Sequence, residues 1–492
     1  MQEQIFVHGY FGRNKGILTG FVIFSIMSGT SYMLWSFLFE QASGFAGGTA
    51  DTSIQQLCLS AGLCLLYFVV SQQLMFYFQR RLLKQINTQL KQDVFHALMK
   101  KGVAKFTEKN SAVYLSVLNN DVTNLENNYF AKIPEILQNG FVFLTCAGVL
   151  CYYDVRIVCL VILTALLPVA VPFLIGEKLS QKTKALYEEL ENYNRKLKDW
   201  MGGFEVIHSF QVEDEVKKRR YEGRRYQNPY GILTLLLTYL ILSIQLVVSA
   251  YLVFIGSISE RMLLSIFYLI SSVNNPIREI AYLLLDVKAA IPNARKVETL
   301  FKERPEESKK TGESVKSVMP LELKEVRFGY TKAKEVLHGV NMCFEKGKKY
   351  AIVGSSGCGK STLLKLLANY YKDYEGEILI GEQELRMIER KSLSRKIAMI
   401  HQNVFLFEDT LRANITMFQE YPDEEIKAAV KKAGLEKIVE DNPLGTEQMV
   451  CENGNNFSGG EKQRIAIARA ILTRAEVLLL DEATSSLDAE LS

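Results

Sequence analysis

Six long apolar tracts constrain the fold of this chain more than any other feature of its sequence. They cover residues 17–39, 54–78, 133–153, 155–175, 232–255 and 262–285. Each is long enough to cross a hydrocarbon core of roughly 30 Å as a helix, which takes about 20 residues. Because backbone groups inside lipid must be paired within the segment, the tracts predict α-helices. We therefore expect residues 1–301 to form a six-span helical membrane domain.

The boundary between the third and fourth tracts is the least defined of the six. Asp154 and Arg156 are almost all that separates them, so the two tracts also fit a helical hairpin with a very tight turn. Pro168 and Pro172 should kink the fourth tract, which a membrane helix tolerates when its neighbours satisfy the freed carbonyls.

The distribution of Lys and Arg between the tracts predicts their orientation. Basic residues are concentrated after the second and fourth tracts and nearly absent after the first, third and fifth. The positive-inside rule then places those two basic stretches and both termini in the cytoplasm, in an integral multi-pass protein of the cell (plasma) membrane. Both stretches have a helical pattern and should continue the membrane helices past the headgroups. Turn-prone breaks at residues 109–112 and 201–204 are candidate contact points for a soluble domain, unless the stretches are plain solvated hairpins.

Composition excludes several other classes of function. A formal net charge of +4 over 492 residues is too small to indicate a nucleic-acid partner. The eight Cys residues lack C-x-x-C spacing, so neither a zinc site nor a disulfide framework is expected. Those in or beside apolar tracts read as small buried hydrophobes, namely Cys58, Cys64, Cys146, Cys151 and Cys159.

A charged linker, residues 302–320, separates the membrane domain from a soluble α/β domain, residues 321–492. Within the second domain the pattern predicts strands at 321–328, 349–353, 377–380 and 477–480, and a helix at 362–368.

A glycine-rich motif in this second domain fits G-x-x-x-x-G-K-[ST] and lies between a predicted strand and the predicted helix. Its glycines let backbone N–H groups approach phosphate oxygens, Lys360 adds a positive charge for the β- and γ-phosphates, and Ser361 offers a hydroxyl to Mg²⁺. The alternative, an ordinary glycine-rich turn, holds only if nothing else in the sequence agrees. The motif predicts nucleotide binding by Gly354, Ser355, Ser356, Gly357, Cys358, Gly359, Lys360, Ser361 and Thr362.

Two acidic residues supply what the glycine-rich motif lacks. Asp481 and Glu482 directly follow the apolar run 477–480. Asp481 is placed to hold Mg²⁺ through its water shell, and Glu482 to orient or deprotonate an attacking water. Such a pair is a weak signal alone, but it becomes strong together with a phosphate-binding motif earlier in the same domain.

Residues 457–463, Phe-Ser-Gly-Gly-Glu-Lys-Gln, resemble the signature motif of the ATP-binding cassette (ABC) transporters. Other positions match the family in the same order. Tyr330 resembles the aromatic that stacks on adenine, and Gln402 resembles the glutamine that senses the γ-phosphate beside Mg²⁺. Residues 486–488 resemble the loop that contacts the opposite subunit, and residues 114–122 and 203–210 resemble the two intracellular loops of six-span exporters. The resemblance covers nearly the whole chain.

This resemblance implies a dimeric half-transporter. In the family, the residues matching Ser458, Gly459 and Gly460 close on the γ-phosphate of ATP held by the partner's phosphate loop. A helix expected over 460–471 would supply the N–H groups for that anion site, and an ordinary capped helix is the alternative. The implied cofactors are ATP and Mg²⁺, with Glu482, Lys360 and Gln402 catalytic and with Ser361, Gln402 and Asp481 at the metal. The implied partner is a second half-transporter, with a homodimer favoured and a heterodimer possible.

The resemblance also implies export of an apolar or amphipathic solute (a peptide, lipid or drug) by a protein in contact with membrane lipid. Uncharged polar residues in or beside the tracts are candidates to line its pathway, although hydrogen bonding between helices explains such residues equally well. They are Gln72, Gln73, Gln138, Asn139, Gln245, Asn274 and Asn275. Arg278 and Glu279 are expected to mark the cytoplasmic end of the sixth tract.

Three departures from the family pattern bear on activity. Cys451 stands where exporters usually have Gly, and residues 111–113 lack the Gly expected in the first intracellular loop. The sequence also holds neither the strand nor the switch histidine that follow the position of Asp488 in the family. We therefore expect an incomplete cassette that hydrolyses ATP poorly. The alternative function is a catalytically impaired or regulatory membrane protein that binds ATP without completing the cycle.

Overall fold

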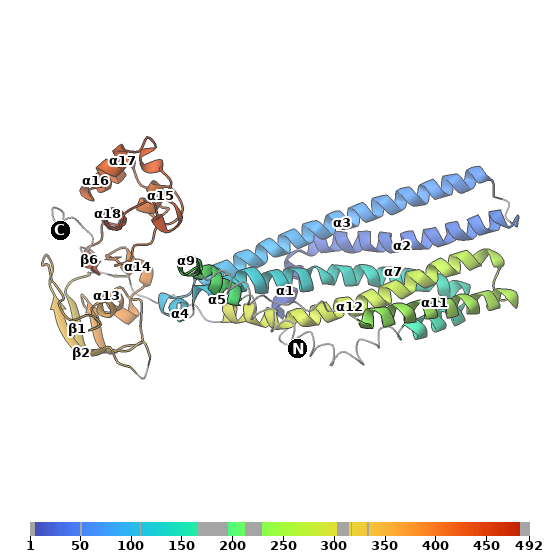
Figure 1. Ribbon diagram of the computed structural model, residues 1–492, viewed down its shortest axis with the longest axis horizontal. Helices are drawn as coiled ribbons and strands as arrows, with labels where there is room; N and C mark the ends of the chain where they lie inside the picture. Colours follow the sequence, from blue (N-terminus) through green and yellow to red (C-terminus); the bar gives the residue numbers. More distant parts are fainter. Residues whose placement is uncertain are drawn as a thin grey trace. The chain divides into compact units, whose positions relative to one another are not determined.

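The computed structural model describes residues 5–49, 52–108, 110–165, 167, 195–211, 229–302, 314–315, 317–331 and 334–482. The chain divides into two compact units (Figure 1). One consists of Met1–Ala97 and Ala112–Glu303, and the other of Leu98–Ser111 and Arg304–Ser492. The tip of the first basic stretch is therefore grouped with the α/β part of the chain.

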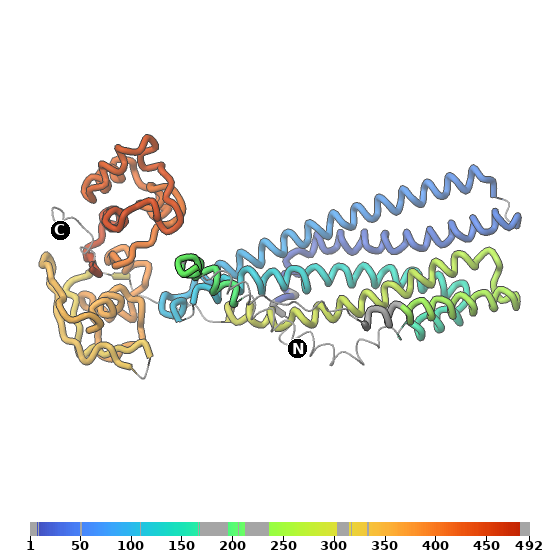
Figure 2. The backbone as a smooth tube through the Cα atoms, in the orientation of Figure 1, coloured from blue at the N-terminus to red at the C-terminus, as the bar shows by residue number. Residues whose placement is uncertain are grey.

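The first unit is built from long helices that run alongside one another (Figures 1 and 2). Its main helices are α1 (Ile5–Arg13), α2 (Lys15–Ala46), α3 (Ile54–Met99), α7 (Lys132–Tyr153), α11 (Pro229–Phe254) and α12 (Leu263–Lys302). Four described helical stretches are long and apolar enough to cross a membrane, namely Lys15–Ala46, Ile54–Met99, Ser111–Tyr153 and Leu236–Phe254. The chain is thus an integral membrane protein.

Each predicted tract is helical where the structure describes it, apart from Ile255 at the end of the fifth tract. The fourth tract is described as the short apolar helix Val155–Ala165, while Pro168 and Pro172 lie outside the described residues. The sixth tract lies within α12 apart from its first residue, Met262, and α12 continues to Lys302. Since only four described stretches meet the length and composition of a span, the count of six remains a prediction.

The turn between the third and fourth tracts consists of Asp154 alone. Its backbone is extended, with φ −163° and ψ 120°. Its carboxylate accepts a hydrogen bond from the backbone N–H of Arg156 at 2.7 Å and pairs with the Arg156 guanidinium at 2.6 Å. The Asp154 side chain therefore caps the start of the next helix, and Asp154 is the single residue between the two helices.

The basic stretches continue the membrane helices. With 46 residues, α3 is about 70 Å long at 1.5 Å per residue, well beyond a bilayer of roughly 45 Å including headgroups. Before α7, helical backbone continues from α5 (Ser111–Ser116) through α6 (Val122–Leu125), with π-helical segments at Val117–Asp121 and Glu126–Phe130. Beyond the second break at Gly203, helix resumes as α9 (Phe204–Ser209). Continuation of the membrane helices is thus confirmed for the first stretch, through α3 and into α7, while the second stretch is helical where it is described.

The membrane unit has an apolar core between α7, α12 and the helix Val155–Ala165, formed by residues such as Val142, Cys146, Ile266 and Leu269. Only Cys146 of the five tract cysteines is buried. The interpretation of the others as buried is wrong for Cys58, Cys151 and Cys159, which are exposed. Their side chains lie on faces of the helices that the packing of this chain leaves uncovered.

The second unit contains a four-stranded antiparallel sheet, a two-stranded parallel sheet and a helical part. The first sheet has the order β2-β1-β3-β4, formed by β1 (Leu321–Phe328), β2 (Leu337–Phe344), β3 (Glu375–Ile380) and β4 (Gln383–Glu384). The second pairs β5 (Ile397–Ile400) with β6 (Val477–Leu480). Helix α13 (Lys360–Leu367) packs into the core of the first sheet.

The helical part has a separate core under α15 (Leu411–Thr416), α16 (Asp423–Lys432) and α18 (Gly459–Leu472). Among the described residues this unit also contains the short α-helices α4 (Val103–Thr107), α14 (Arg390–Ser394) and α17 (Glu436–Glu440).

One of the four predicted strands is absent. The strands predicted at 321–328, 377–380 and 477–480 are confirmed as β1, part of β3 and β6. The strand predicted at 349–353 is wrong, since this segment has no regular structure and Val353 is 90% exposed. None of the described strands pairs with it, and a strand forms only where a neighbour completes its backbone hydrogen bonds.

Candidate nucleotide-binding site

The glycine-rich loop leads directly into α13. Gly359 caps this helix with φ +99°, and a Cβ there would come within 2.8 Å of Leu337 Cδ2. A Cβ on Gly354 would come within 2.6 Å of Cys358 Sγ. Gly359 therefore requires glycine because of its positive φ, whereas a side chain at Gly354 would first have to displace the Cys358 thiol. The helix begins at Lys360, two residues earlier than predicted, so Ser361 and Thr362 lie in its first turn, where N–H groups lack helical partners and attract anions.

Lys360 lies back over this loop. Its Nζ donates to the carbonyl oxygens of Gly354 at 2.9 Å and Ser355 at 3.0 Å. The ammonium group thus stands beside the backbone that was predicted to surround phosphate.

Ser361 and Asp481 are brought together from positions 120 residues apart. The Ser361 hydroxyl donates to Asp481 Oδ1 at 2.6 Å, and the Asp481 carboxylate is buried, with 7% of the residue exposed. The backbone N–H of Asp481 bonds to the Ile400 carbonyl at 3.0 Å, which fixes it at the end of the parallel sheet. Two of the three residues predicted to hold a metal, Ser361 and Asp481, therefore meet.

Gln402 and Glu482 meet at the same edge of that sheet. In the parallel register Ile400 lies opposite Leu480, so the residues two positions beyond each strand end face each other. Gln402 Nε2 donates to Glu482 Oε2 at 2.6 Å. Glu482 has φ +51°, a sparsely populated region for a residue other than glycine that is often found at functional sites.

The sequence prediction missed β5, the strand that positions Gln402. Its available signal was the short apolar run Ile-Ala-Met-Ile at residues 397–400, directly before His401 and Gln402. A run of four residues does not by itself distinguish strand from helix.

Tyr330 lies beside the first turn of α13. Its hydroxyl is 3.0 Å from Thr362 Oγ1, and its ring meets Phe328 and Tyr371 edge-on at centroid distances of 5.2 and 5.4 Å. Half of the residue is exposed. The Tyr330 ring therefore lies next to the glycine-rich loop and is accessible for stacking by a nucleotide base.

The signature residues begin α18. Ser458 caps this helix in a capping box, with its Oγ accepting from Glu461 N at 3.3 Å and Glu461 Oε2 accepting from Ser458 N at 2.6 Å. The predicted helix 460–471 is confirmed to within one residue at each end. The N–H groups of Gly459 and Gly460, in the first turn of α18, have no partner within the helix.

In the part of the chain that the structure describes, no hydrogen bond or ion pair joins Ser458, Gly459 or Gly460 to the glycine-rich loop. Phosphate loop, Asp481, Glu482, Gln402 and Tyr330 form one group, and the signature residues form another.

Two residues with structural roles near this site escaped the sequence prediction. Arg469 of α18 donates to the Phe405 carbonyl at 2.9 Å and to the Asn414 carbonyl at 2.6 Å, and so holds the loop that follows Gln402. Burial lowers the pKa of Arg469 to about 10. His401 Nε2 lies 3.2 Å from the Tyr370 hydroxyl, and burial lowers the pKa of this imidazole. Nothing in the local sequence distinguishes either residue.

Both halves of the chain match models of known protein families. Residues 18–277 match the model of the ABC transporter transmembrane region, and residues 337–485 match the ABC transporter model. The chain is 26% identical over 424 residues to the putative ABC transporter ATP-binding protein exp8 of Streptococcus pneumoniae, covering 82% of this chain and 71% of that protein. It is 26% identical over 427 residues to an ATP-dependent lipid A-core flippase of Hahella chejuensis, covering 84% and 73%.

Among solved structures, a bacterial Atm1-family ABC exporter with ATP bound is similar, with a TM-score of 0.80 and 22% identity. The alignment covers 97% of this chain and 87% of the exporter chain. The similarity shows that the helical unit and the α/β unit together have the fold of that structure.

Proposed function

Since this chain belongs to the ABC transporters, as its match to the family's transmembrane region and ATP-binding domain shows, we propose that it exports an apolar or amphipathic solute as one half of a dimeric transporter. Membership carries ATP binding and ATPase-coupled transport with it. What we propose beyond membership is the nature of the solute, the dimer and the roles of the individual residues.

The observation that carries the proposal is the pair of hydrogen bonds at the end of the parallel sheet. Ser361–Asp481 and Gln402–Glu482, both 2.6 Å, stand next to a loop whose glycines and helix start suit phosphate. In this arrangement Lys360 binds the β- and γ-phosphates, Glu482 accepts the proton of the attacking water, and Gln402 orients that water. Tyr330 stacks on the adenine.

The donor set fits Mg²⁺. The described residues contain no cluster of three or more His, Cys, Asp or Glu side chains that could hold a metal by themselves. Mg²⁺ is typically bound by one or two carboxylates together with substrate phosphates and water, which the buried Asp481 carboxylate, the Ser361 hydroxyl and Gln402 can satisfy. When bound, Mg²⁺ supplies positive charge against the phosphate oxygens.

A second copy of the chain would complete the site. The start of α18 is a helix end suited to an anion, and no group of its own chain among the described residues fills that place. The phosphate loop, for its part, has no described helix start facing it. Head-to-tail pairing satisfies both, and two identical intact sites favour a homodimer. We place both termini in the cytoplasm of a cell (plasma) membrane protein, where ATP is available.

Closure of the two cassettes on ATP then shifts the membrane helices from inward- to outward-facing through the breaks at 109–112 and 201–204. The name of one relative, a lipid A-core flippase, supports an amphipathic solute. The uncharged character of most polar residues in the tracts supports it as well.

The test measures ATP hydrolysis and uptake of a labelled amphiphile by the full chain in inside-out vesicles. Replacing Glu482→Gln should lower hydrolysis about 100-fold or more while ATP binding persists, since removal of a general base costs on the order of 10² to 10⁴ in rate. Glu440→Gln, an exposed glutamate of the same unit, is the control and should leave the rate unchanged. ATP binding without hydrolysis or uptake by the unaltered chain would instead support the regulatory alternative.

A further inference from the structure

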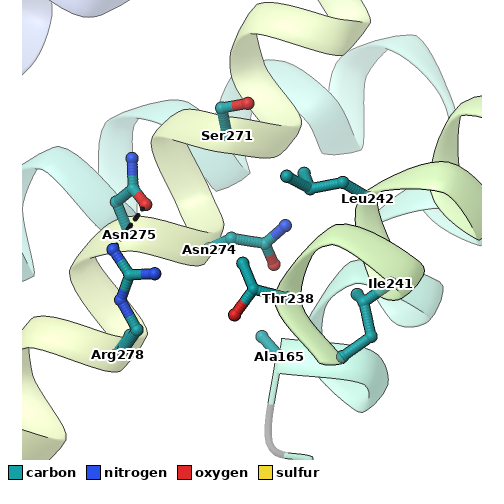
Figure 3. Close-up of a pocket in the computed structure, with 8 residues that line it drawn as sticks. All are labelled: Ala165, Thr238, Ile241, Leu242, Ser271, Asn274, Asn275 and Arg278. Atoms are coloured by element: carbon teal, nitrogen blue, oxygen red, sulfur yellow. Dashed lines mark hydrogen bonds between the residues drawn. The ribbon is translucent and has the colours of Figure 1, made fainter. Parts of the chain in front are cut away.

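Two cavities of the membrane unit differ in size and in the charges that line them. The smaller one, which we call the membrane cavity, has about 130 Å³ and lies between α11, α12 and the helix Val155–Ala165 (Figure 3). Arg278 is the one charged side chain among the described residues that line it. The larger one, which we call the outer cavity, has about 670 Å³ and is lined by Phe37, Glu40, Gln41, Tyr153, Arg261 and Met262, among others. Cavities that hold small molecules typically have roughly 300–1,000 Å³.

The polar groups beside the membrane cavity are bonded mainly to one another. Gln245 Nε2 donates to Thr164 Oγ1 at 2.5 Å, and Asn274 Nδ2 donates to Gln245 Oε1 at 2.9 Å. Asn274 Oδ1 has no hydrogen-bond partner, but protein atoms enclose it and a molecule in the cavity does not reach it. This chain of bonds therefore joins the helix Val155–Ala165 to α11 and α12 instead of facing a ligand.

The outer cavity carries charges of both signs. Glu40 of α2 and Arg261, which lies just before α12, both line it. No ion pair joins these two side chains in the described part of the chain, and neither pairs with another charge there. Charged groups that are drawn partly out of water are usually paired. Two opposite charges that share a cavity without meeting suit one ligand that carries both signs.

Tyr153 holds the carboxylate of Glu40 in one orientation. The Tyr153 hydroxyl donates to Glu40 Oε2 at 2.6 Å and lies 3.3 Å from the buried Ser265 Oγ. Since Tyr153 gives its one hydroxyl hydrogen to Glu40, Ser265 is the donor in the second contact. Glu40 Oε1 accepts no hydrogen bond from the described residues. One oxygen of this carboxylate is therefore left to accept from an ammonium group.

Arg261 is anchored through one of its N–H groups. Its Nη2 donates to the backbone carbonyl of Thr49, in the connection between α2 and α3, and the residue is exposed. Because a guanidinium carries five N–H donors in a planar fork, most of them remain to bind a phosphate or carboxylate.

The outer cavity lies where the apolar tracts end. Glu40 directly follows the first tract, and Thr52, which also lines the cavity, stands two residues before the second. Tyr153 is the last residue of the third tract and Met262 the first of the sixth. The basic stretches lie at the opposite ends of these tracts, so the cavity is at the depth of the outer headgroups in the proposed orientation. Tyr152, which is 80% exposed, is of a type enriched at this depth.

We propose that the outer cavity binds a zwitterion, an ammonium group joined by a short bridge to an acid group, and that the phosphoethanolamine headgroup of an outer-leaflet lipid supplies it. The ammonium donates to Glu40, the phosphate accepts from Arg261, and the adjoining glycerol and acyl chains lie against Phe37 and Met262. Binding rests on the cavity alone, and only the leaflet rests on the orientation given under the proposed function.

The experiment measures binding of dihexanoyl phosphatidylethanolamine to the full chain in nonionic detergent by titration calorimetry. Dihexanoyl phosphatidylglycerol keeps the phosphate but lacks the ammonium, and it should bind about tenfold more weakly, since the charge-assisted bond to Glu40 is lost. Free phosphoethanolamine has both charges but no acyl chains, and it should also bind about tenfold more weakly, because it leaves the apolar wall uncovered.

Two variants and a matched control locate the binding. Glu40→Gln keeps an acceptor for Tyr153 and should bind phosphatidylethanolamine and phosphatidylglycerol equally, whereas a merely structural defect would weaken both lipids alike. Arg261→Gln should weaken both lipids about tenfold. Glu260→Gln removes the same charge as Glu40→Gln from an exposed position beside Arg261 and should leave both affinities within about twofold, since charge at an exposed site is screened. Because Arg261 is exposed, its replacement decides the question even if Glu40→Gln fails to fold.

Absence of phosphatidylethanolamine binding, equal binding of both lipids by the unaltered chain, or equal effects of Arg261→Gln and Glu260→Gln would each overturn the site. Free phosphoethanolamine that binds as tightly as the lipid would overturn the lipid source and assign the cavity to a soluble zwitterion. A chain that binds the lipid as expected but neither hydrolyses ATP nor takes up an amphiphile would keep the site and refute the proposed function. Transport by a chain that does not bind the lipid would do the reverse.

Discussion

In the cassette, Ser361 pairs with Asp481 and Gln402 pairs with Glu482, each at 2.6 Å, whereas in the membrane cavity Asn274 keeps a buried acceptor without a partner. The polar groups of the nucleotide site hold one another in position before any ligand arrives, and a ligand has to replace some of these bonds. In the cavity, the scaffold of Thr164, Gln245 and Asn274 leaves its last acceptor open.

The difference indicates two kinds of specificity. A site whose groups are mutually bonded is preorganised for one geometry, as a reaction with a fixed transition state requires. In the membrane unit, by contrast, the Asn274 acceptor is left without a partner and fixes no such geometry. The predictions below test the preorganised half of this comparison, from the largest expected effect to the smallest.

Replacing Lys360→Ala should weaken ATP binding about tenfold to 100-fold. Its ammonium now lies against the Gly354 and Ser355 carbonyls, and in the bound state it would make charge-assisted bonds worth about 1.5–3 kcal/mol. Titration with a fluorescent ATP analogue measures the change, with the exposed Lys391→Ala as control. Equal affinity of both variants would show that the loop binds phosphate through its backbone alone.

Replacing Asp481→Asn should raise the Mg²⁺ concentration needed for hydrolysis about tenfold. The amide keeps the hydrogen bond from Ser361 but removes the carboxylate charge, and a charge-assisted contact is roughly twice as strong as a neutral one. Hydrolysis is measured against Mg²⁺ concentration, with the exposed Asp423→Asn as control. An unchanged Mg²⁺ requirement would remove Asp481 from the metal site.

Replacing Ser458→Ala should destabilise the start of α18 by about 1 kcal/mol, because its Oγ caps the Glu461 N–H. Ser458→Thr preserves the cap and should cost little. Hydrogen exchange of the first turn of α18 measures both effects in the full chain. If the two variants lose protection equally, the cap does not stabilise this helix end.

The smallest expected effect is a dependence of cassette stability on His401 protonation. Burial, followed by the nearby positive charge of Lys365, lowers the pKa of His401 below its ordinary value of 6.5. The unfolded chain then takes up a proton at a higher pH than the folded chain. Stability is therefore fully present above about pH 6.5 and falls as the pH drops through the lowered pKa.

Unfolding of the chain between pH 7.5 and 5 measures this dependence. His401→Gln should flatten the acidic decline without changing stability above pH 7 by much. A decline that is equally steep in the variant would assign it to other groups.

Much of the nucleotide site was predictable because its parts are local. Gly357 and Gly359 both have positive φ, which is a requirement of the loop itself, and the predicted roles of Lys360 and Ser361 rest on their place at the start of α13. The apolar tracts likewise predicted helices, since lipid leaves the backbone few alternatives.

Where the prediction failed or stopped, distant segments decide the outcome. The strand at 349–353 was predicted from its own apolar residues, but its formation depends on a neighbour that the described strands do not supply. The parallel register of β5 and β6 places Gln402 against Glu482 across 80 residues of sequence. The sequence left open whether Asn274 lines a pathway or contacts another helix. In the structure its Nδ2 donates to Gln245 Oε1, whereas its Oδ1 is buried without a hydrogen-bond partner.

The sequence by itself therefore determined the membrane helices, the phosphate loop and the cap of α18, because backbone pairing in lipid, glycine conformations and helix capping are short-range effects. Only the tertiary structure decided which carboxylate meets which hydroxyl or amide, and which polar atom in the membrane stays without a partner. Those outcomes depend on the packing of segments as far as 120 residues apart, and no local pattern records that packing.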